Sequence, residues 1–401
     1  MRCRRIMLAT FILQLIKEVF SIKSSPIKVD SSHIHRFVVA RTATLSESIA
    51  QQLPNITLER AQELVHLGSV YITDTLSGKD KRVVNDFVIP AQSNVRVHHT
   101  PKRYPRCHST EWSKRVLYMD DDFVVVDKPW GVVTMPHTSN FREVLHSSVS
   151  EALGIPPLIP LNRIDEFTSG VVVSARTKEA ASYFQNLLRN NKVHKKYIAL
   201  SHGTPKVGKM VHYMRKTPAF RLAAPRLISD INHNCEWDVW KNCELVVKCT
   251  QPFAAVPGQH DITTGSDSGG AAAALLCESS IRLITGRTHQ IRAQFSAAGY
   301  PLLNDLQYAP MRSYLVPEIP PPGGEFPDEL HERMQRGRGP LRLGLGLYCA
   351  EIEFGGRRVV GLGPWWREGL GNDVDTLLGG ESRSSCLAAD QKRELVVGVG
   401  A

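Results

Sequence analysis

One stretch constrains the fold of this chain more than any other, because a polar turn carrying an acid leads directly into β-branched residues. The turn covers residues 161–167, and Thr168, Ser169 and Gly170 follow it. Residues 171–173 are all valine, a run typical of a buried strand and too short for a helix. An aspartate just ahead of a buried strand has its carboxylate at a rigid rim, which suits a nucleophile or a base. Asp165 is therefore a candidate catalytic residue, and a carboxylate that only caps backbone amides is the alternative.

The composition indicates a globular protein with a polyanionic partner. The chain has 401 residues and a hydrophobic fraction of 42%, enough for a sizeable core in two or three domains. Its formal net charge of +10 and its pI of about 9.2 favour RNA or DNA over a neutral metabolite. The 8 cysteines contain no C-x-x-C pair, so we expect free thiols in a reducing compartment and neither a zinc site nor a disulfide scaffold.

Residues 1–36 have the composition of a targeting segment. Arginines precede an apolar stretch at residues 6–16 that is too short to span a bilayer, and serines with further basic residues follow. A segment rich in Arg and Ser and poor in acids is typical of an organelle transit peptide. A mitochondrial or plastid address is favoured over the cytoplasm, with a secretory signal and a wrongly chosen start codon as the alternatives.

Residues 43–100 have the pattern of a small α+β module. An apolar stripe within residues 45–53 predicts one helix, and Thr57 fits the N-cap of a second helix that ends at Gly68. Alternating segments at residues 70–73, 82–84 and 94–97 predict short strands. A linker rich in Pro and Arg follows at residues 101–115.

This order of two helices and a small sheet resembles the S-four-type RNA-binding domain. The segment "RAQELVHLGSVYI" would then be the helix and strand presented to RNA. The residues expected to contact phosphates are Arg60, His66, Lys81, Arg82 and Arg96. A solvated charged face is the alternative reading.

The larger domain opens at residue 116 with two apolar strands that flank three consecutive aspartates. Clustered carboxylates suit a hard cation, but no accompanying His or Asp pattern supports a metal here. Further along, Thr177 fits a helix N-cap, and residues 193–200 alternate as a strand. Tyr197 shares a face of that strand with Lys195 and Ala199. Such an aromatic side chain either fills a core or, beside a nucleotide, forms a stacking platform.

A second sharp signal lies at residues 286–295, after a predicted strand at residues 275–285. A helix should follow and end at Gly299. His289 and Arg292 lie three residues apart on a face away from the apolar side chains. Arg292 can therefore be a fixed counter-charge for a carboxylate, or an ordinary surface arginine. Residues 251–273 and 310–340 are rich in Gly, Ser, Pro and Ala and predict disordered surface insertions.

Four ordered stretches together resemble the RluA-type pseudouridine synthases. They are "LNRIDEFTSGVVVSARTKEAA", "KKYIAL", "TGRTHQIRAQF" and "GYPLLNDLQYA", and "DDFVVVDKPWGVVTMP" is similar to the opening strands of the same family. The resemblance covers roughly residues 43–354, insertions excepted. It implies an RNA pseudouridine synthase that isomerises specific uridines in structured rRNA or tRNA and needs no cofactor or metal.

The resemblance also implies roles for individual residues. Asp165 would be the catalytic aspartate, Tyr197 would stack on the target base, and Arg292 would pair with the aspartate. Arg163 would correspond to the arginine that helps displace the base. The further expected substrate-binding residues are Arg287, His289, Gln290 and Lys196. The chain departs from the family pattern at Asn162, Phe167, Ala293, Gln294 and Asn304, which concerns substrate choice and rate more than the chemistry.

For the fold we predict an α+β catalytic domain at residues 116–365, on a mixed, mostly antiparallel sheet flanked by helices. A strand at residues 347–354 should have one face buried, and residues 366–401 should be a disordered tail. The expected partner is RNA, with no membrane and no obligate protein partner, and we expect a monomer. Two alternative functions are a catalytically inactive RNA-binding or ribosome-assembly protein and a hydrolase that uses Asp165 with His289 or His137.

Overall fold

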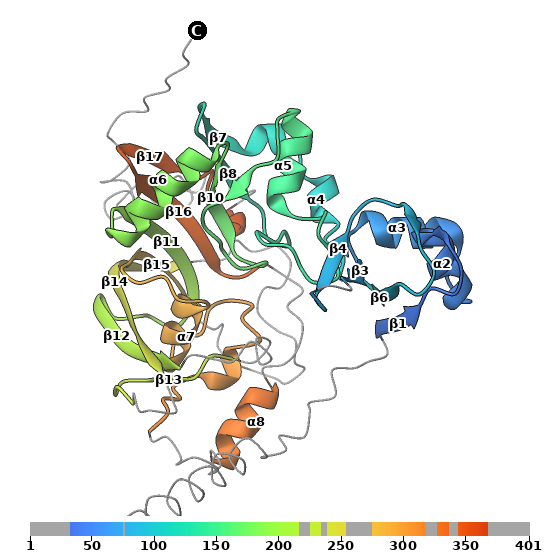
Figure 1. Ribbon diagram of the computed structural model, residues 1–401. Coiled ribbons are helices and arrows are strands. Elements are labelled where there is room, and N and C mark those ends of the chain that lie inside the picture. Colours follow the sequence, from blue (N-terminus) through green and yellow to red (C-terminus); the bar gives the residue numbers. More distant parts are fainter. Residues whose placement is uncertain are drawn as a thin grey trace, which may run out of the picture. The chain divides into compact units, whose positions relative to one another are not determined.

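The computed structural model describes residues 33–74, 77–215, 225–233, 239–253, 275–317, 327–336 and 344–367. The described residues form two compact units (Figure 1). Unit 1 contains those up to Arg103 together with His137–Arg142, and unit 2 contains Tyr104–Pro136 and those from Glu143 onward. Each unit has its own sheet and its own hydrophobic core. No helix in the described ranges is both long and apolar enough to cross a membrane.

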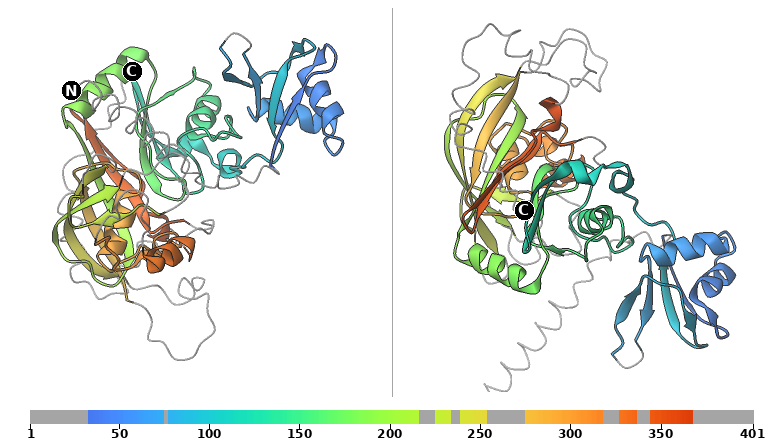
Figure 2. Two further views of the ribbon diagram at one scale, coloured as in Figure 1. Left: turned by 60° about the horizontal axis from the view of Figure 1, so that its bottom comes forward. Right: turned by 90° about the horizontal axis from the view of Figure 1, so that it is seen from above.

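Unit 1 is an α+β module in which two helices cover one face of a sheet (Figure 2). The strands run in the order β1 (Ile34–Val38), β6 (Asn94–His98), β3 (Val70–Thr73) and β4 (Asp80–Val83), and β2 (Ala43–Thr44) pairs with β5 (Val88–Ile89). The helices are α2 (Leu45–Gln52) and α3 (Leu58–His66). The Thr57 hydroxyl accepts a hydrogen bond from the Arg60 amide at 3.2 Å, as an N-cap residue should.

Strand β1 shows that this module begins earlier than the boundary we placed at residue 43. The strand pairs antiparallel with β6, from Ile34 opposite His98 to Val38 opposite Asn94. It therefore includes residues 34–36, which we had assigned to the targeting segment. Residues 1–32 of that segment lie outside the described residues.

The expected linker at residues 101–115 is wrong for most of its length. Residues 104–115 belong to unit 2 and contain the helix α4 (Arg106–Ser109) and the 3-10 turn η2 (Trp112–Arg115). Tyr104, Cys107 and Trp112 are buried in the main core of unit 2. Burial of these apolar side chains outweighs the high content of Pro and Arg that suggested a linker.

Unit 2 is built on a mixed, mostly antiparallel sheet flanked by helices, which confirms the predicted fold class. The strand order is β13 (Ile228–Ser229), β12 (Gly208–Arg215), β14 (Trp240–Phe253), β15 (Leu276–Leu283), β11 (Val193–His202), β16 (Leu347–Phe354), β10 (Ser169–Ala175), β8 (Phe123–Lys128) and β7 (Val116–Met119). β9 (Ile159–Pro160) pairs with β10, and β17 (Arg357–Val360) pairs with β16. Helices α5 (Leu145–Leu153), α6 (Lys178–Arg189), α7 (Gln290–Ala297) and α8 (Asp328–Arg336) accompany the sheet.

Strand β16 is buried on both faces, so our expectation of one buried face is wrong. It lies between β11 and β10 in the middle of the sheet. Cys349 faces the main core, whereas Tyr348 packs with Trp366 in a second apolar cluster. Trp366 belongs to η5 (Trp365–Arg367), and its indole Nε1 donates to Glu278 Oε1 at 2.9 Å. The predicted disordered tail therefore does not begin at residue 366, and residues 368–401 lie outside the described residues.

The insertion predicted at residues 310–340 contains ordered structure. The 3-10 turn η4 (Ala309–Met311) and helix α8 contribute Met311 and Leu330 to a buried cluster with Trp240. These apolar side chains had been obscured by the surrounding Pro and Gly residues. Residues 318–326 and 337–340 of that range, and residues 254–273 of the other predicted insertion, lie outside the described residues.

Within the described strands, β10 and β16 form the parallel pair and the other ladders are antiparallel. Gly170 of β10 and Tyr197 of β11 both lie in register with Cys349 of β16. Gly170 has φ +114°, and a Cβ atom there would lie 2.3 Å from the Cys349 carbonyl oxygen. A side chain at this position would therefore push β10 away from β16.

We predict that Gly170→Ala destabilises unit 2 by about 3 kcal/mol or more, because backbone atoms must move to relieve the clash. Gly154→Ala is the control, since Gly154 also has a positive φ but no atom lies within 4 Å of its Cβ position. That variant should lose only about 1–2 kcal/mol from backbone strain. Urea unfolding followed by tryptophan fluorescence measures both, and equal losses would contradict the proposed close packing.

Candidate active site

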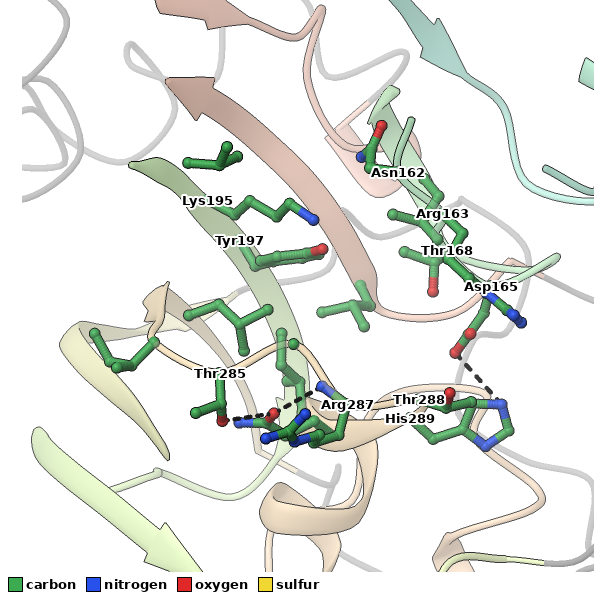
Figure 3. Close-up of a pocket in the computed structure, with 18 of the residues that line it drawn as sticks. Asn162, Arg163, Asp165, Thr168, Lys195, Tyr197, Thr285, Arg287, Thr288 and His289 are labelled. Carbon is green, nitrogen blue, oxygen red and sulfur yellow. Dashed lines mark hydrogen bonds and ion pairs between the residues drawn. The ribbon is translucent and has the colours of Figure 1, made fainter. Parts of the chain in front are cut away.

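A cavity of about 800 Å³ lies in unit 2 where three segments meet. They are the loop before β10, the beginning of β11 and the loop before α7, and Figure 3 shows their side chains facing the same space. Asp165 comes from the first segment, Tyr197 from the second and His289 from the third, and Arg292 follows in the first turn of α7. The fold thus brings together sequence motifs that lie up to 127 residues apart.

The loop that carries Asp165 is held by backbone contacts on both sides. The Thr134 hydroxyl donates to the Ile164 carbonyl at 3.1 Å, and the Gly131 amide donates to the Glu166 carbonyl at 2.8 Å. The Leu345 amide donates to the Phe167 carbonyl at 2.9 Å. Strand β10, which is buried along its whole length, begins just beyond. The carboxylate is therefore presented by a rigid loop, as the sequence predicted.

Lys128 is a fully buried lysine that fastens this loop to its neighbour. Its Nζ donates to the carbonyls of Pro129 at 3.0 Å, Val132 at 2.7 Å and Glu166 at 3.1 Å. Three acceptors satisfy the three donors of an ammonium group. Burial lowers the pKa of Lys128 to about 7, although the charges of Asp165 and Glu166 oppose the shift.

Arg292 is the central cation of the site and is almost completely buried. Its Nε and Nη2 atoms donate to the two carboxylate oxygens of Asp305, each at 2.8 Å, and Nη2 also donates to Gln307 Oε1 at 2.8 Å. Its Nη1 donates to Asp165 Oδ2 at 3.3 Å. The guanidinium also lies 5.0 Å from the ring centroid of Tyr308. The bidentate pair with Asp305 fixes the guanidinium plane, so Nη1 has a defined direction toward Asp165.

Asp165 is ionised in this environment. Its side chain is 21% exposed, and the burial of the rest opposes ionisation. His289 in its protonated form, the charge of Arg292 and the hydrogen bond from Arg292 outweigh burial and hold the pKa of Asp165 below its usual value. Within the described residues, no group donates to Oδ1. One carboxylate oxygen is therefore anchored and the other remains available for chemistry.

His289 completes the polar rim of the cavity. Its Nε2 lies 3.7 Å from Asp165 Oδ2, and its Nδ1 lies 3.2 Å from the Tyr308 hydroxyl. Burial lowers the pKa of His289 to about 4, with the nearby Arg292 charge adding to the effect and Asp165 opposing it. The imidazole is therefore neutral at pH 7 and is a weak partner for Asp165 beside the permanent charge of Arg292. His289 precedes α7 with a left-handed backbone (φ 60°), so it does not share a helical face with Arg292 as we expected.

Tyr197 forms part of the opposite wall and is buried. Burial raises the pKa of its hydroxyl well above the usual value, and the neighbouring Cys349 adds to this effect. The phenol therefore stays protonated at neutral pH. In Figure 3 its ring projects from β11 toward the loop that carries Asp165.

The other expected substrate-binding residues divide into two groups. Arg163 and Arg287 are exposed and line the cavity. Gln290 also lines the cavity, but its side-chain amide makes four hydrogen bonds inside the protein. It accepts from the Thr285 hydroxyl and the Arg287 amide, and it donates to the Glu244 carbonyl and Gln294 Oε1. The amide therefore shapes the loop before α7, and its contact with a substrate stays a prediction.

Lys196 does not line the cavity, and Lys195 does. Successive side chains of a strand point to opposite faces, so the lysine that shares a face with Tyr197 is the one two residues before it. That alternation was visible in the sequence and identifies Lys195. Two of the acceptors of Arg292, Asp305 and Gln307, were also missed, although both belong to the motif at residues 299–309.

The basic residues predicted in unit 1 are only partly exposed. Arg82 donates to the carbonyls of Gly68 and His137, and Arg96 pairs with Asp80 at 2.8 Å. Both guanidinium groups also lie over the ring of Tyr71, at 4.9 and 4.1 Å from its centroid. Arg82 and Arg96 therefore hold the module together more than they present charge. Lys81, Arg60 and His66 remain at the surface, with Lys81 paired to Asp74 and Arg60 to Glu63.

Among the described residues, no cluster of three or more His, Cys, Asp or Glu side chains is arranged to hold a metal ion. The Asp120 carboxylate in the acidic turn accepts hydrogen bonds from Arg357 and from the amides of Asp122 and Phe123.

Comparison with known proteins places this geometry in a family. A family model described as RNA pseudouridylate synthase matches residues 122–297, which include Asp165, Tyr197 and Arg292. RNA pseudouridine synthase 6, chloroplastic, of Arabidopsis thaliana is 36% identical over 299 residues, which are 69% of this chain and 61% of that protein. Dual-specificity RNA pseudouridine synthase RluA of Escherichia coli (strain K12) is 27% identical over 195 residues, 48% of this chain and 76% of that protein.

Residues 122–297 of the chain form an RluA-type pseudouridine synthase domain. RNA pseudouridine synthase 6, chloroplastic, of Oryza sativa subsp. japonica is 34% identical over 301 residues, 70% of this chain and 61% of that protein. The chain thus spans 61% of the length of each of these two plant relatives. The family explains why the motifs around Asp165, Tyr197 and Arg292 occur in this order, and it leaves the roles of individual residues to be tested.

The site predicts how the pKa of Asp165 depends on Arg292. Arg292→Met alone would leave Asp305 buried without a partner, so the informative variant is Arg292→Met with Asp305→Asn. Loss of the cation destabilises the ionised carboxylate, so the pKa of Asp165 should rise toward or above its ordinary value. Asp305→Asn alone keeps the cation and should leave that pKa low. Carbon-13 NMR titration of the Asp165 carboxyl measures both, and an unchanged pKa in the double variant would contradict the assignment.

Proposed function

We propose that this protein is an RNA pseudouridine synthase that isomerises specific uridines in structured RNA, rRNA or tRNA, through Asp165. The observation that carries the proposal is the ionised Asp165 carboxylate, held by buried Arg292 at the rim of a cavity whose opposite wall is Tyr197. The RluA-type domain supports the same reaction.

The cavity has the charge that an RNA substrate requires. Among the described residues that line it, Asp165 is the only carboxylate, whereas Arg163, Arg282 and Arg287 are exposed cations. These arginines suit the phosphates on either side of a target nucleotide. A uridine within folded RNA must leave its stack to enter, at a cost of about a few kcal/mol. Stacking on an aromatic ring such as Tyr197 returns about 1–3 kcal/mol.

The chemistry follows from the position of the carboxylate. The free Oδ1 of Asp165 attacks the sugar at C1′ or removes a proton from it, and in either case the bond between C1′ and N1 breaks. The detached uracil turns while Tyr197 keeps it in the cavity, and C5 joins C1′ as the Asp165 carboxylate leaves that carbon or returns the proton that it took. The proton on C5 then leaves, and N1 takes up a proton. Because the Tyr197 phenol is protonated at neutral pH, it accepts the C5 proton only as part of a relay that passes its own proton on.

The hydrolase alternative is weaker than the synthase proposal. It needs a base beside Asp165, and the candidate His289 lies 3.7 Å from Asp165 Oδ2 and is a weak base, because its pKa is lowered to about 4. His137 belongs to unit 1 and is not among the residues that line the cavity. An RNA-binding protein without turnover remains the second candidate, and a product assay separates it from the synthase.

Two further features belong to the proposal. Unit 1 is proposed to bind RNA, because its surface carries Lys81 and Arg36 with side chains 72% and 63% exposed. A plastid location is proposed because the first segment has the composition of a transit peptide, and the names of both plant relatives include "chloroplastic". We propose a monomer that acts without an obligate protein partner.

Asp165→Asn should abolish pseudouridine formation, by at least about 10⁴-fold, because an amide is a poor nucleophile and a poor base. The volume of the side chain is nearly unchanged, so folding and RNA affinity should survive. Asp121→Asn is the matched control, since the Asp121 side chain is fully exposed. Single-turnover conversion of a transcribed RNA, followed by nucleoside chromatography, measures the product. A measurable fraction of the parent rate in Asp165→Asn would refute the role of Asp165, and an inactive parent would favour the RNA-binding alternative.

If unit 1 contacts phosphates, Arg60→Gln combined with Lys81→Gln should weaken RNA binding and flatten its dependence on salt. The slope of log K against log salt should fall by up to about 0.7 for each lost contact with single-stranded RNA. Lys178→Gln removes an exposed charge from unit 2 and is the control. Filter binding between low and moderate salt measures the slope, and an unchanged slope in the double variant would exclude these two residues from the interface.

A further inference from the structure

We propose that Lys195 contacts the target uracil directly and carries the counter-charge for the anion that the ring becomes when it leaves the ribose. The inference rests on the proposed function, because it concerns a step of that reaction. It adds a second cation to the site: Arg292 stabilises the Asp165 carboxylate, and Lys195 stabilises the uracil anion.

The position of Lys195 follows from the register of the sheet. It lies on β11 two residues before Tyr197, and both side chains line the cavity. Both also interact with Cys349 on the neighbouring strand β16, so the lysine amine and the tyrosine hydroxyl lie near the same sulfur atom. In Figure 3 the two side chains project side by side from β11 toward the loop that carries Asn162 and Thr168. An edge of a base stacked on Tyr197 is therefore within reach of the Lys195 amine.

Lys195 differs from the other lysine of the site in having no partner. Within the described residues its amine makes no hydrogen bond and no ion pair, whereas the Lys128 amine donates to three carbonyls. Burial lowers the pKa of Lys195, which shows that its surroundings disfavour the charge. A partly dehydrated amine without a partner is unfavourable on its own, and an incoming acceptor or anion removes that cost.

The reaction generates such an anion beside Lys195. When the bond between C1′ and N1 breaks, its electron pair goes to uracil, and the negative charge spreads over N1, O2 and O4. The Lys195 ammonium donates to a carbonyl oxygen and stabilises this charge where it develops. When C5 attacks C1′, the electron pair of the ring forms the new bond, and the Asp165 carboxylate leaves C1′ or returns the proton that it took from the sugar. The C5 proton is then released and N1 takes up a proton, so the ring is neutral and Lys195 ends with the proton with which it began.

A base contact fits the geometry better than a phosphate contact. Arg163, Arg282 and Arg287 are exposed at the rim, where the backbone of a bound strand can pass. Lys195 is only partly exposed and lies next to the aromatic wall, where the flipped base is held. The phosphate contact is therefore the competing outcome of the test.

The test compares Lys195→Met, Lys195→Arg and the control Lys178→Met under single-turnover conditions with saturating RNA. We expect Lys195→Met to lower the rate constant by about 10²-fold or more, as loss of one charge-stabilising donor does in other enzymes. Lys195→Arg keeps the charge and should fall between that variant and the parent. RNA affinity and its salt slope, measured in the Asp165→Asn background to prevent turnover, should not change.

A second substrate tests whether Lys195 acts on the uracil ring as it leaves the ribose. RNA with 5-fluorouridine at the target position releases a more stable anion, because fluorine withdraws electron density from the ring. The loss caused by Lys195→Met should therefore be smaller for cleavage of that nucleotide than for uridine. An equal loss on both substrates would overturn the counter-charge role.

Two other results would also overturn the inference. A parent-like saturating rate in Lys195→Met would show that the amine takes no part, and a salt slope lowered by about 0.7 without a change in rate would assign Lys195 to a phosphate. Both leave the proposed function intact, since the parent protein still makes pseudouridine. Absence of product from the parent is a different result, which refutes the proposed function itself.

Discussion

The site depends on a single buried guanidinium that two carboxylates share unequally. Arg292 is fixed by two 2.8 Å hydrogen bonds to Asp305, and it reaches Asp165 through one longer bond of 3.3 Å. Because Asp305 is fully buried, removing either member of that pair would leave an uncompensated charge in the interior. Asp305 therefore acts as the structural partner of the cation. The Asp165 carboxylate is partly exposed. The charge of Arg292 favours its ionised form, but the single hydrogen bond leaves its other oxygen available.

The sheet supplies the second constraint, which is the distance across the cavity. Gly170 follows the Asp165 loop on β10, and Tyr197 lies on β11, with β16 between them and Cys349 in register with both. The separation of the reactive carboxylate from the aromatic wall is thus set by the width of one strand. The close approach of β10 to β16 requires glycine at residue 170. Lys128 then fixes the loop that carries Asp165 by donating a hydrogen bond to the Glu166 carbonyl.

The errors of the sequence reading have a common physical cause. Composition suggested a linker at residues 101–115, an insertion at residues 310–340 and a tail from residue 366, yet Trp112, Leu330 and Trp366 are buried in cores. A few large apolar side chains anchor a segment whose remaining residues are Pro, Gly or Arg, because the free energy of burial depends on the area removed from water and not on average composition. The choice of Lys196 as a substrate-binding residue has a different cause. Side chains alternate along a strand, so the sequence already placed Lys195, and not Lys196, on the same face as Tyr197.

The sequence by itself determined the class of the fold, the helices and strands that carry the motifs, and Asp165, Tyr197 and Arg292 as the residues to examine. Local signals suffice for these, because strand period, N-caps and ordered motifs are properties of neighbouring residues. Only the tertiary structure decided that Asp305 anchors Arg292, that the Gln290 amide makes four internal hydrogen bonds, and that the Lys195 amine makes no hydrogen bond or ion pair among the described residues. Those facts depend on which buried polar groups meet across as many as 127 residues of sequence, and no local pattern records such contacts.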